Sequence, residues 1–150
     1  MRLADLLDES VVKLGLESVD KEECIEEMVE LLVRSGCLSD RQMALDALFS
    51  REKIGSTGIG NGVAIPHAKS GCVEKLTAAL GVSLEGIEFD AIDGQEAHLV
   101  FLLLADPQRP GPHVAALAEV ARLLQLPGFY RKIVSAKTPE EVLEIISEEE

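Results

Sequence analysis

A glycine-rich stretch that ends in a histidine is the part of this sequence best suited to chemistry. Residues 55–62 read Gly-Ser-Thr-Gly-Ile-Gly-Asn-Gly, and three apolar residues and Pro66 then lead to His67. Glycine lets backbone N–H groups approach a ligand closely, whereas Pro66 restricts its own backbone and that of Ile65. We expect a loop that feeds a short strand and holds His67 at the strand end.

A neutral imidazole is a nucleophile that can accept a phosphoryl group, because its ordinary pKa is about 6.5. The negative oxygens of that group need donors, which the loop can supply from its backbone and from the Ser56 and Thr57 hydroxyls. Arg51 can add a two-pronged contact, and a helix that begins near His113 would direct its positive end to the same point. The convergence of these separate segments is a prediction about the fold.

Each of these residues also has a purely structural interpretation. Arg51 can serve as a cation at a helix C-terminus, and His113 as an ordinary residue of a first helical turn. His98 lies in an apolar stretch and is expected to be a hydrogen-bonded strand histidine, and Lys69 is expected to be solvated. The glycine stretch matches neither the phosphate-binding loop of nucleotide triphosphatases nor the dinucleotide-binding fingerprint.

Composition favours one domain of the α/β or α+β class over residues 1–150. The chain is 47% apolar and has no tryptophan, which indicates an aliphatic core between helix and sheet layers. Its net charge of −13 argues against nucleic acids and anionic membranes as partners. The acidic residues at the C-terminal end are expected to be a solvated helix face.

Cysteine usage and the lack of long apolar runs bear on location. Cys24, Cys37 and Cys72 are odd in number and show no C-x-x-C spacing, so we expect neither disulfides nor a zinc ribbon. No stretch approaches the roughly 20 apolar residues of a membrane-spanning helix, and no leader is evident. A reduced, cytoplasmic location without membrane insertion is the expectation.

The spacing of apolar residues and the positions of turn and capping residues predict the helices and strands that must position the candidate residues. A central strand is expected over 97–105, because it is apolar on both alternating faces. Glu85-Gly86 reads as a turn, and residues 108–112 read as a loop with no helical capacity. Asp20, Ser39 and Thr138 are the expected helix caps. Further strands and helices are expected over 11–16, 21–36, 40–53, 63–65, 76–84, 113–124, 129–134 and 139–146.

The motif resembles the signature of enzyme IIA domains of the bacterial phosphoenolpyruvate-dependent phosphotransferase system, in the mannitol/fructose-type family. The residues that carry the resemblance are Arg51-Glu52-Lys53, the run 55–62 and Ala64-Ile65-Pro66-His67. The uninterrupted run 55–62 is most similar to the nitrogen-regulatory branch. Two departures are Ala68, where glycine is common, and Val114, where leucine is more usual.

The resemblance implies a fold, a function and roles for the candidate residues. The fold would be an α/β three-layer sandwich with a mixed central sheet flanked by helices. His67 would accept a phosphoryl group from the phosphocarrier protein HPr, usually at Nε2, with His113 as the orienting and stabilising histidine. Arg51, Ser56 and Thr57 would bind the phosphate, and no metal or cofactor would be needed.

Downstream, two roles stay open, and one remote alternative belongs to another class. The phosphoryl group would pass to a sugar-transporter IIB domain, or the phosphorylation state would decide docking to a regulated kinase or transporter. The lack of a second domain within these 150 residues favours a free-standing carrier or regulator. A zinc hydrolase using His67, His113 and a carboxylate is the remote alternative. It is disfavoured because the histidine spacing lacks any zinc signature.

Overall fold

Strand β6 (Ala97–Ala105) lies at the centre of the sheet, as its apolar sequence predicts. In this computed structural model, which describes residues 1–150, every residue of β6 except His98 is buried. On one side β6 pairs antiparallel with β5 (Thr77–Ile87). On its other side it pairs in parallel with two short strands, β3 (Val63–Ala64) and β4 (His67–Lys69).

Two outer strands complete a mixed six-stranded sheet. β1 (Val12–Leu14) runs parallel to β5, and β2 (Gly58–Gly60) runs antiparallel to β3. The order is β1-β5-β6-β3-β2, with β4 also beside β6. The mixed sheet agrees with the predicted fold class, because parallel and antiparallel pairs occur together.

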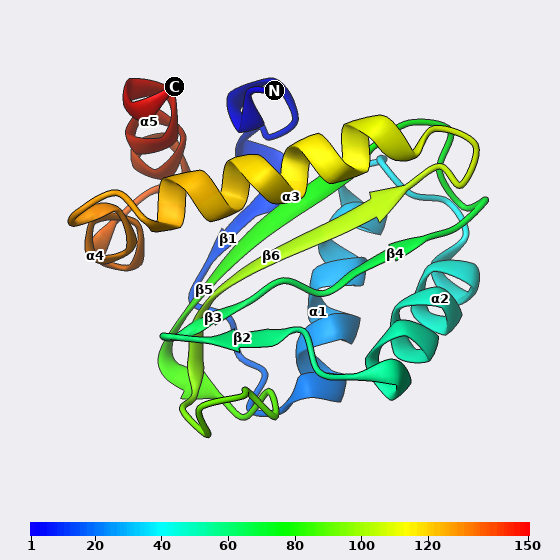
Figure 1. Cartoon of the computed structure of the whole chain (residues 1–150), viewed down its shortest axis with the longest axis horizontal. Helices are drawn as coiled ribbons and strands as arrows, with labels where there is room; N and C mark the ends of the chain where they lie inside the picture. Colours follow the sequence, from blue (N-terminus) through cyan, green and yellow to red (C-terminus); the bar gives the residue numbers. More distant parts are fainter.

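Helices lie on both faces of this sheet (Figure 1). One face is covered by the two N-terminal helices, and the other is crossed by α3, beside which the two C-terminal helices lie. The helices are α1 (Lys21–Arg34), α2 (Arg41–Ile54), α3 (Pro110–Leu124), α4 (Phe129–Ser135) and α5 (Pro139–Glu149), and two 3₁₀ turns, η1 (Leu3–Asp5) and η2 (Glu9–Val11), precede β1. The result is the expected α/β three-layer sandwich.

The chain from Val63 to Lys69 follows β6 as an interrupted strand. The strand expected over 63–65 is the shorter β3, and a second strand that was not predicted, β4, follows after Ile65 and Pro66. Proline has no N–H to donate to a neighbouring strand, yet its carbonyl still accepts from Leu103 N at 3.0 Å. His67 therefore begins the second strand in a fixed position beside β6.

Helix caps confirm two of the predicted starts and shift a third. The Asp20 side chain accepts from Glu23 N at 2.9 Å, and Thr138 Oγ1 accepts from Glu141 N at 3.1 Å. At α2, Asp40 is the cap in place of Ser39, and it accepts from Met43 N at 3.0 Å. Both residue types are good caps, so the sequence alone identified the start to within one residue.

Two loop predictions were wrong. α3 begins at Pro110, inside the segment predicted to have no helical capacity. The first turn of a helix has no intrahelical use for its N–H groups, so proline there removes nothing. Gly86, predicted to lie in a turn, is part of β5, where a register shift between Val82 and Ile87 and a φ of +99° accommodate it as a strand irregularity.

The acidic C-terminal end makes a specific contact that the prediction of a solvated end missed. The Glu150 carboxylate accepts from Leu3 N at 2.7 Å and from Ala4 N at 3.1 Å. These N–H groups belong to η1, whose own turn leaves them without partners. The two ends of the chain consequently lie close together (Figure 1).

Gly62 joins the glycine stretch to the central strand, and we expect alanine there to destabilise the fold. Its carbonyl accepts from His98 N at 2.8 Å and from Leu99 N at 3.0 Å. Its φ is +80°, and an added Cβ would lie 2.2 Å from Tyr130 Oη. Positive φ and overpacking together should cost about 2 to 4 kcal/mol in the free energy of unfolding, which urea denaturation measures.

The matched control for Gly62→Ala is Gly71→Ala. An added Cβ at Gly71 meets no atom within 4 Å, and its backbone does not require glycine. That variant should be as stable as the parent chain or slightly more stable. Equal losses in the two variants would contradict the strain assigned to Gly62.

Candidate functional site

His67 presents one ring nitrogen with a free lone pair. Its Nδ1 lies 2.6 Å from the Ile65 carbonyl oxygen. A carbonyl oxygen can only accept a hydrogen bond, so Nδ1 carries the proton and Nε2 of the neutral ring does not. The side chain is half-buried at the start of β4. The geometry thus leaves Nε2 as the nucleophilic nitrogen.

His113, the fourth residue of α3, lies beside His67. The two ring centroids are 5.4 Å apart, with the planes inclined by 50°. His113 is 6% exposed, and its Nδ1 has no hydrogen-bond partner. Burial, and then the nearby His67 and Lys69, lower the pKa of His113. A lowered pKa favours the uncharged ring, so His113 is neutral near pH 7.

Two cations border the same place. Arg51, in the last turn of α2, donates from Nη1 to the Gly55 carbonyl at 2.9 Å. It is therefore a C-terminal helix cation, as its structural interpretation predicts, and its guanidinium has further donors. Lys69, at the end of β4, is exposed and forms no ion pair.

These side chains line one open hollow of about 410 Å³ between α2, β4 and the start of α3. Its lining residues are Ala47, Ser50, Arg51, Ile54, His67, Ala68, Lys69 and His113. None of them is acidic, although the chain carries a net charge of −13. Two cations and two imidazoles without a carboxylate make this hollow suited to a negatively charged group.

Ser56 and Thr57 do not line this hollow. Ser56 Oγ donates to the Phe89 carbonyl at 2.7 Å, and the Thr57 hydroxyl is bonded to the Glu52 carboxylate. Thr57 is 3% exposed. The structure therefore brings His67, His113 and Arg51 together, as predicted, and directs the two loop hydroxyls into the protein.

Lys69 is the residue of the hollow that sequence reasoning assigned to solvent alone. Successive side chains of a strand point to opposite faces, so residues two apart share a face. His67 and Lys69 have this spacing in β4. The spacing of His67 and Lys69 is visible in the sequence. It predicts a shared face only if His67 begins a strand, which the sequence did not indicate.

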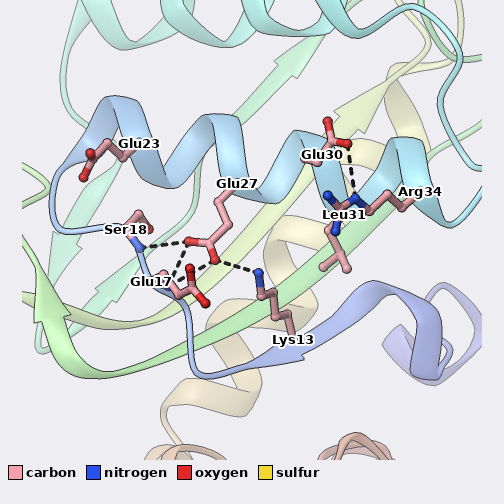
Figure 2. A pocket seen from close by; sticks show the side chains of 8 residues that line it. All are labelled: Lys13, Glu17, Ser18, Glu23, Glu27, Glu30, Leu31 and Arg34. Atoms are coloured by element: carbon pink, nitrogen blue, oxygen red, sulfur yellow. Dashed lines mark hydrogen bonds and ion pairs between the residues drawn. The ribbon is translucent and has the colours of Figure 1, made fainter.

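A larger hollow, of about 700 Å³, lies beside α1 and β1 (Figure 2). Four of its eight lining residues are glutamates, among which Glu27 is central. The Glu27 carboxylate pairs with Lys13 Nζ at 2.8 Å and accepts from Glu17 N at 3.1 Å and Ser18 N at 3.0 Å (Figure 2). These bonds tie β1 to α1, so we assign this carboxylate to the structure of the fold.

Two further findings concern metals and membranes. No group of three or more His, Cys, Asp or Glu side chains is arranged to hold a metal ion. None of the helices combines the length and the apolar run that crossing a bilayer requires. The third histidine, His98, hydrogen-bonds through Nδ1 to the Ser83 carbonyl at 2.8 Å, as expected of a strand histidine.

Comparison with known proteins gives one consistent family. Residues 5–149 match the family model described as "Phosphoenolpyruvate-dependent sugar phosphotransferase system, EIIA 2". The fructose-specific EIIABC component of Bacillus subtilis is 38% identical over 99% of this chain, which spans 23% of that protein's length. A nitrogen regulatory protein of Klebsiella oxytoca is 36% identical over 99% of this chain and 91% of its own.

A solved structure of a protein with similar sequence has the same fold. The crystal structure of nitrogen regulatory protein IIA-Ntr from Neisseria meningitidis superposes with a TM-score of 0.87 and 34% identity. The superposition covers 96% of this chain and 98% of that protein. Both a fructose-specific protein and nitrogen regulatory proteins are thus among the similar proteins, at comparable identity.

Proposed function

Because the chain belongs to the EIIA 2 family of the phosphoenolpyruvate-dependent sugar phosphotransferase system, we propose that His67 accepts a phosphoryl group from HPr and passes it on. The observation that carries this proposal is the bond from His67 Nδ1 to the Ile65 carbonyl. It leaves the lone pair of Nε2 free beside a hollow without carboxylates. The proposal therefore names Nε2 as the acceptor.

The transfer is a displacement at phosphorus. The Nε2 lone pair forms the new bond, while the bond from phosphorus to the donor's leaving atom breaks and its electron pair stays with the donor. The product is a phosphorylated imidazolium, whose proton stays on Nδ1 and is still donated to the Ile65 carbonyl. Because no proton has to leave His67 before the attack, this tautomer is ready for transfer.

The neighbouring groups stabilise the charge on the transferred oxygens. The cationic side chains of Arg51 and Lys69 both border the hollow. A neutral His113 can take up a proton or share one as negative charge arrives, since a nearby anion raises the pKa of a histidine. Preorganised donors of this kind are a main source of catalysis in phosphoryl transfer.

Incubation with phosphoenolpyruvate, enzyme I and HPr tests the proposal. We expect one phosphoryl group per chain, stable to base and lost in acid, as a phosphohistidine is. Mass spectrometry of the intact chain counts the groups. A chain that takes up none, or carries an acid-stable group on a hydroxyl residue, would contradict the proposed function.

Lys69→Gln should slow acceptance by about 10-fold, because one of the two cations at the hollow is lost. Glutamine is polar and uncharged and only slightly shorter than lysine, and Lys69 is exposed, so folding should be unaffected. Single-turnover transfer from phosphorylated HPr measures the rate constant. Lys53→Gln removes the same charge from the end of α2 outside the hollow and should transfer at the parent rate.

A second function, docking controlled by the phosphorylation state, is favoured by the similarity to nitrogen regulatory proteins. A phosphoryl group adds close to two negative charges to a hollow whose lining has cations and no carboxylate, enough to make or break an interface. Affinity capture with the unphosphorylated chain and with the phosphorylated chain separates the roles. A regulator binds a kinase or transporter in one state only, whereas a sugar carrier binds its IIB domain.

A further inference from the structure

Glu52 is a residue of α2 whose carboxylate is buried and does not line the hollow. Its side chain is 6% exposed, and it pairs with Lys21 Nζ at 3.1 Å. Lys21 also pairs with Asp90 at 3.3 Å and lies 5.4 Å from the centre of the Phe89 ring. Glu52 follows Arg51 directly, so the turn of α2 that supplies a cation to the hollow also supplies this anion.

Glu52 binds Thr57 through two hydrogen bonds. One carboxylate oxygen accepts from Thr57 N at 3.1 Å, and the other accepts from the Thr57 hydroxyl. With the Lys21 pair, both carboxylate oxygens are engaged. A buried carboxylate held in this way fixes the conformation of its partners, because leaving either oxygen unpaired is costly.

Thr57 is hydrogen-bonded in turn to Ile65, the residue whose carbonyl orients His67. The Thr57 carbonyl accepts from Ile65 N at 2.9 Å. Pro66 restricts Ile65 to an extended backbone, so a fixed Ile65 N also fixes the direction of the Ile65 carbonyl. That carbonyl receives the Nδ1 proton of His67 at 2.6 Å. A continuous set of bonds thus leads from Lys21 to the imidazole.

We propose that Glu52 is a positioning residue for phosphoryl transfer, which keeps His67 in the Nδ1–H tautomer through Thr57 and the Ile65 carbonyl. Without the hydrogen bond from Nδ1 to the Ile65 carbonyl, the imidazole exchanges between its two tautomers, and Nε2 carries a proton for part of the time. A protonated Nε2 has no lone pair for attack. The expected effect on rate rests on the proposed function, since it requires phosphoryl transfer to His67. The tautomer of His67 is a property of the unphosphorylated chain and does not depend on that function.

The tautomer of His67 distinguishes this role from simple stabilisation. Long-range ¹H–¹⁵N spectra of a chain with ¹⁵N-labelled histidine report which ring nitrogen carries the proton, with no phosphoryl donor present. The parent chain should show His67 with the proton on Nδ1 alone. Glu52→Gln should show both tautomers and accept a phosphoryl group about 10-fold more slowly, because reacting groups that lose their alignment transfer more slowly.

Three further variants sharpen the comparison. Glu26→Gln removes a carboxylate from the exposed face of α1, near Glu52, and should match the parent chain in both measurements. Thr57→Val keeps the side-chain shape but loses the hydroxyl, and should follow Glu52→Gln in part. Thr57→Ser restores the hydroxyl and should return the tautomer and the rate to those of the parent.

The outcomes separate failure of this proposal from failure of the proposed function. If Glu52→Gln or Thr57→Val melts earlier yet keeps the proton of His67 on Nδ1 and transfers at the parent rate, Glu52 is only a stabilising residue. If the parent chain takes up no phosphoryl group while the tautomer still changes in Glu52→Gln, the positioning holds and the proposed function fails.

Discussion

The His67→Ala variant is expected to take up no phosphoryl group from phosphorylated HPr under conditions that label the parent chain fully. No comparable nucleophile lines the hollow, because His113 is 6% exposed and the remaining lining groups are cations, apolar residues and the Ser50 hydroxyl, which is a much weaker nucleophile than a neutral imidazole. The change removes a half-buried side chain at the start of β4, so the fold should persist. Intact mass and acid lability of the label are the measurements.

His98→Asn is the control for His67→Ala. The His98 side chain donates from Nδ1 to the Ser83 carbonyl at 2.8 Å, and the Asn side-chain nitrogen can donate to the same oxygen. His98 is in β6 and outside the hollow, so labelling should equal that of the parent chain. Labelling of His67→Ala, or its loss in His98→Asn, would overturn the assignment of the acceptor.

The second large effect is expected at His113. His113→Ala should lower the transfer rate constant by about 100- to 1000-fold, the range seen when one preorganised donor is removed from a site of developing charge. The ring lies 5.4 Å from that of His67, centroid to centroid, and lines the same hollow, so its loss removes a group next to the transferred oxygens. Single-turnover transfer from phosphorylated HPr measures this rate.

Stability and rate should respond differently at His113. The buried Nδ1 of His113 has no partner, so removing the ring breaks no hydrogen bond of the resting fold. The melting temperature of His113→Ala should therefore fall only slightly, although its transfer rate falls strongly. His113→Gln, which keeps a donor and an acceptor, should recover part of the rate. A parent-like rate in His113→Ala would show that this histidine only packs the first turn of α3.

Features governed by local patterns were predictable from the sequence. The apolar run 97–105 became the buried central strand over the expected residues, and Thr138 caps α5 as predicted. Arg51, His67 and His113 come together although 16 and 46 residues separate them along the chain, which the family resemblance indicated and the periodicity did not. The sheet accomplishes this by placing β4 between the end of α2 and the start of α3 (Figure 1).

Features set by distant packing were not predictable. The Ser56 and Thr57 side chains were expected at the phosphate, but their partners are the Phe89 carbonyl and the Glu52 carboxylate. Nothing local to residues 55–62 indicates that Phe89, 33 residues away, will lie beside them. The helical start at Pro110 was missed for a different reason, since proline was read as a helix breaker where it is an ordinary first-turn residue.

Direct identification of the phosphorylated atom is the sharpest test of His67 as the acceptor. A chain with ¹⁵N-labelled histidine, phosphorylated through enzyme I and HPr, gives ³¹P–¹⁵N couplings that name the bonded nitrogen. We expect a single phosphoryl group on Nε2 of His67, with the proton still on Nδ1. A phosphoryl group on Nδ1 of His67, on His113, or on any residue other than histidine would contradict the proposed transfer.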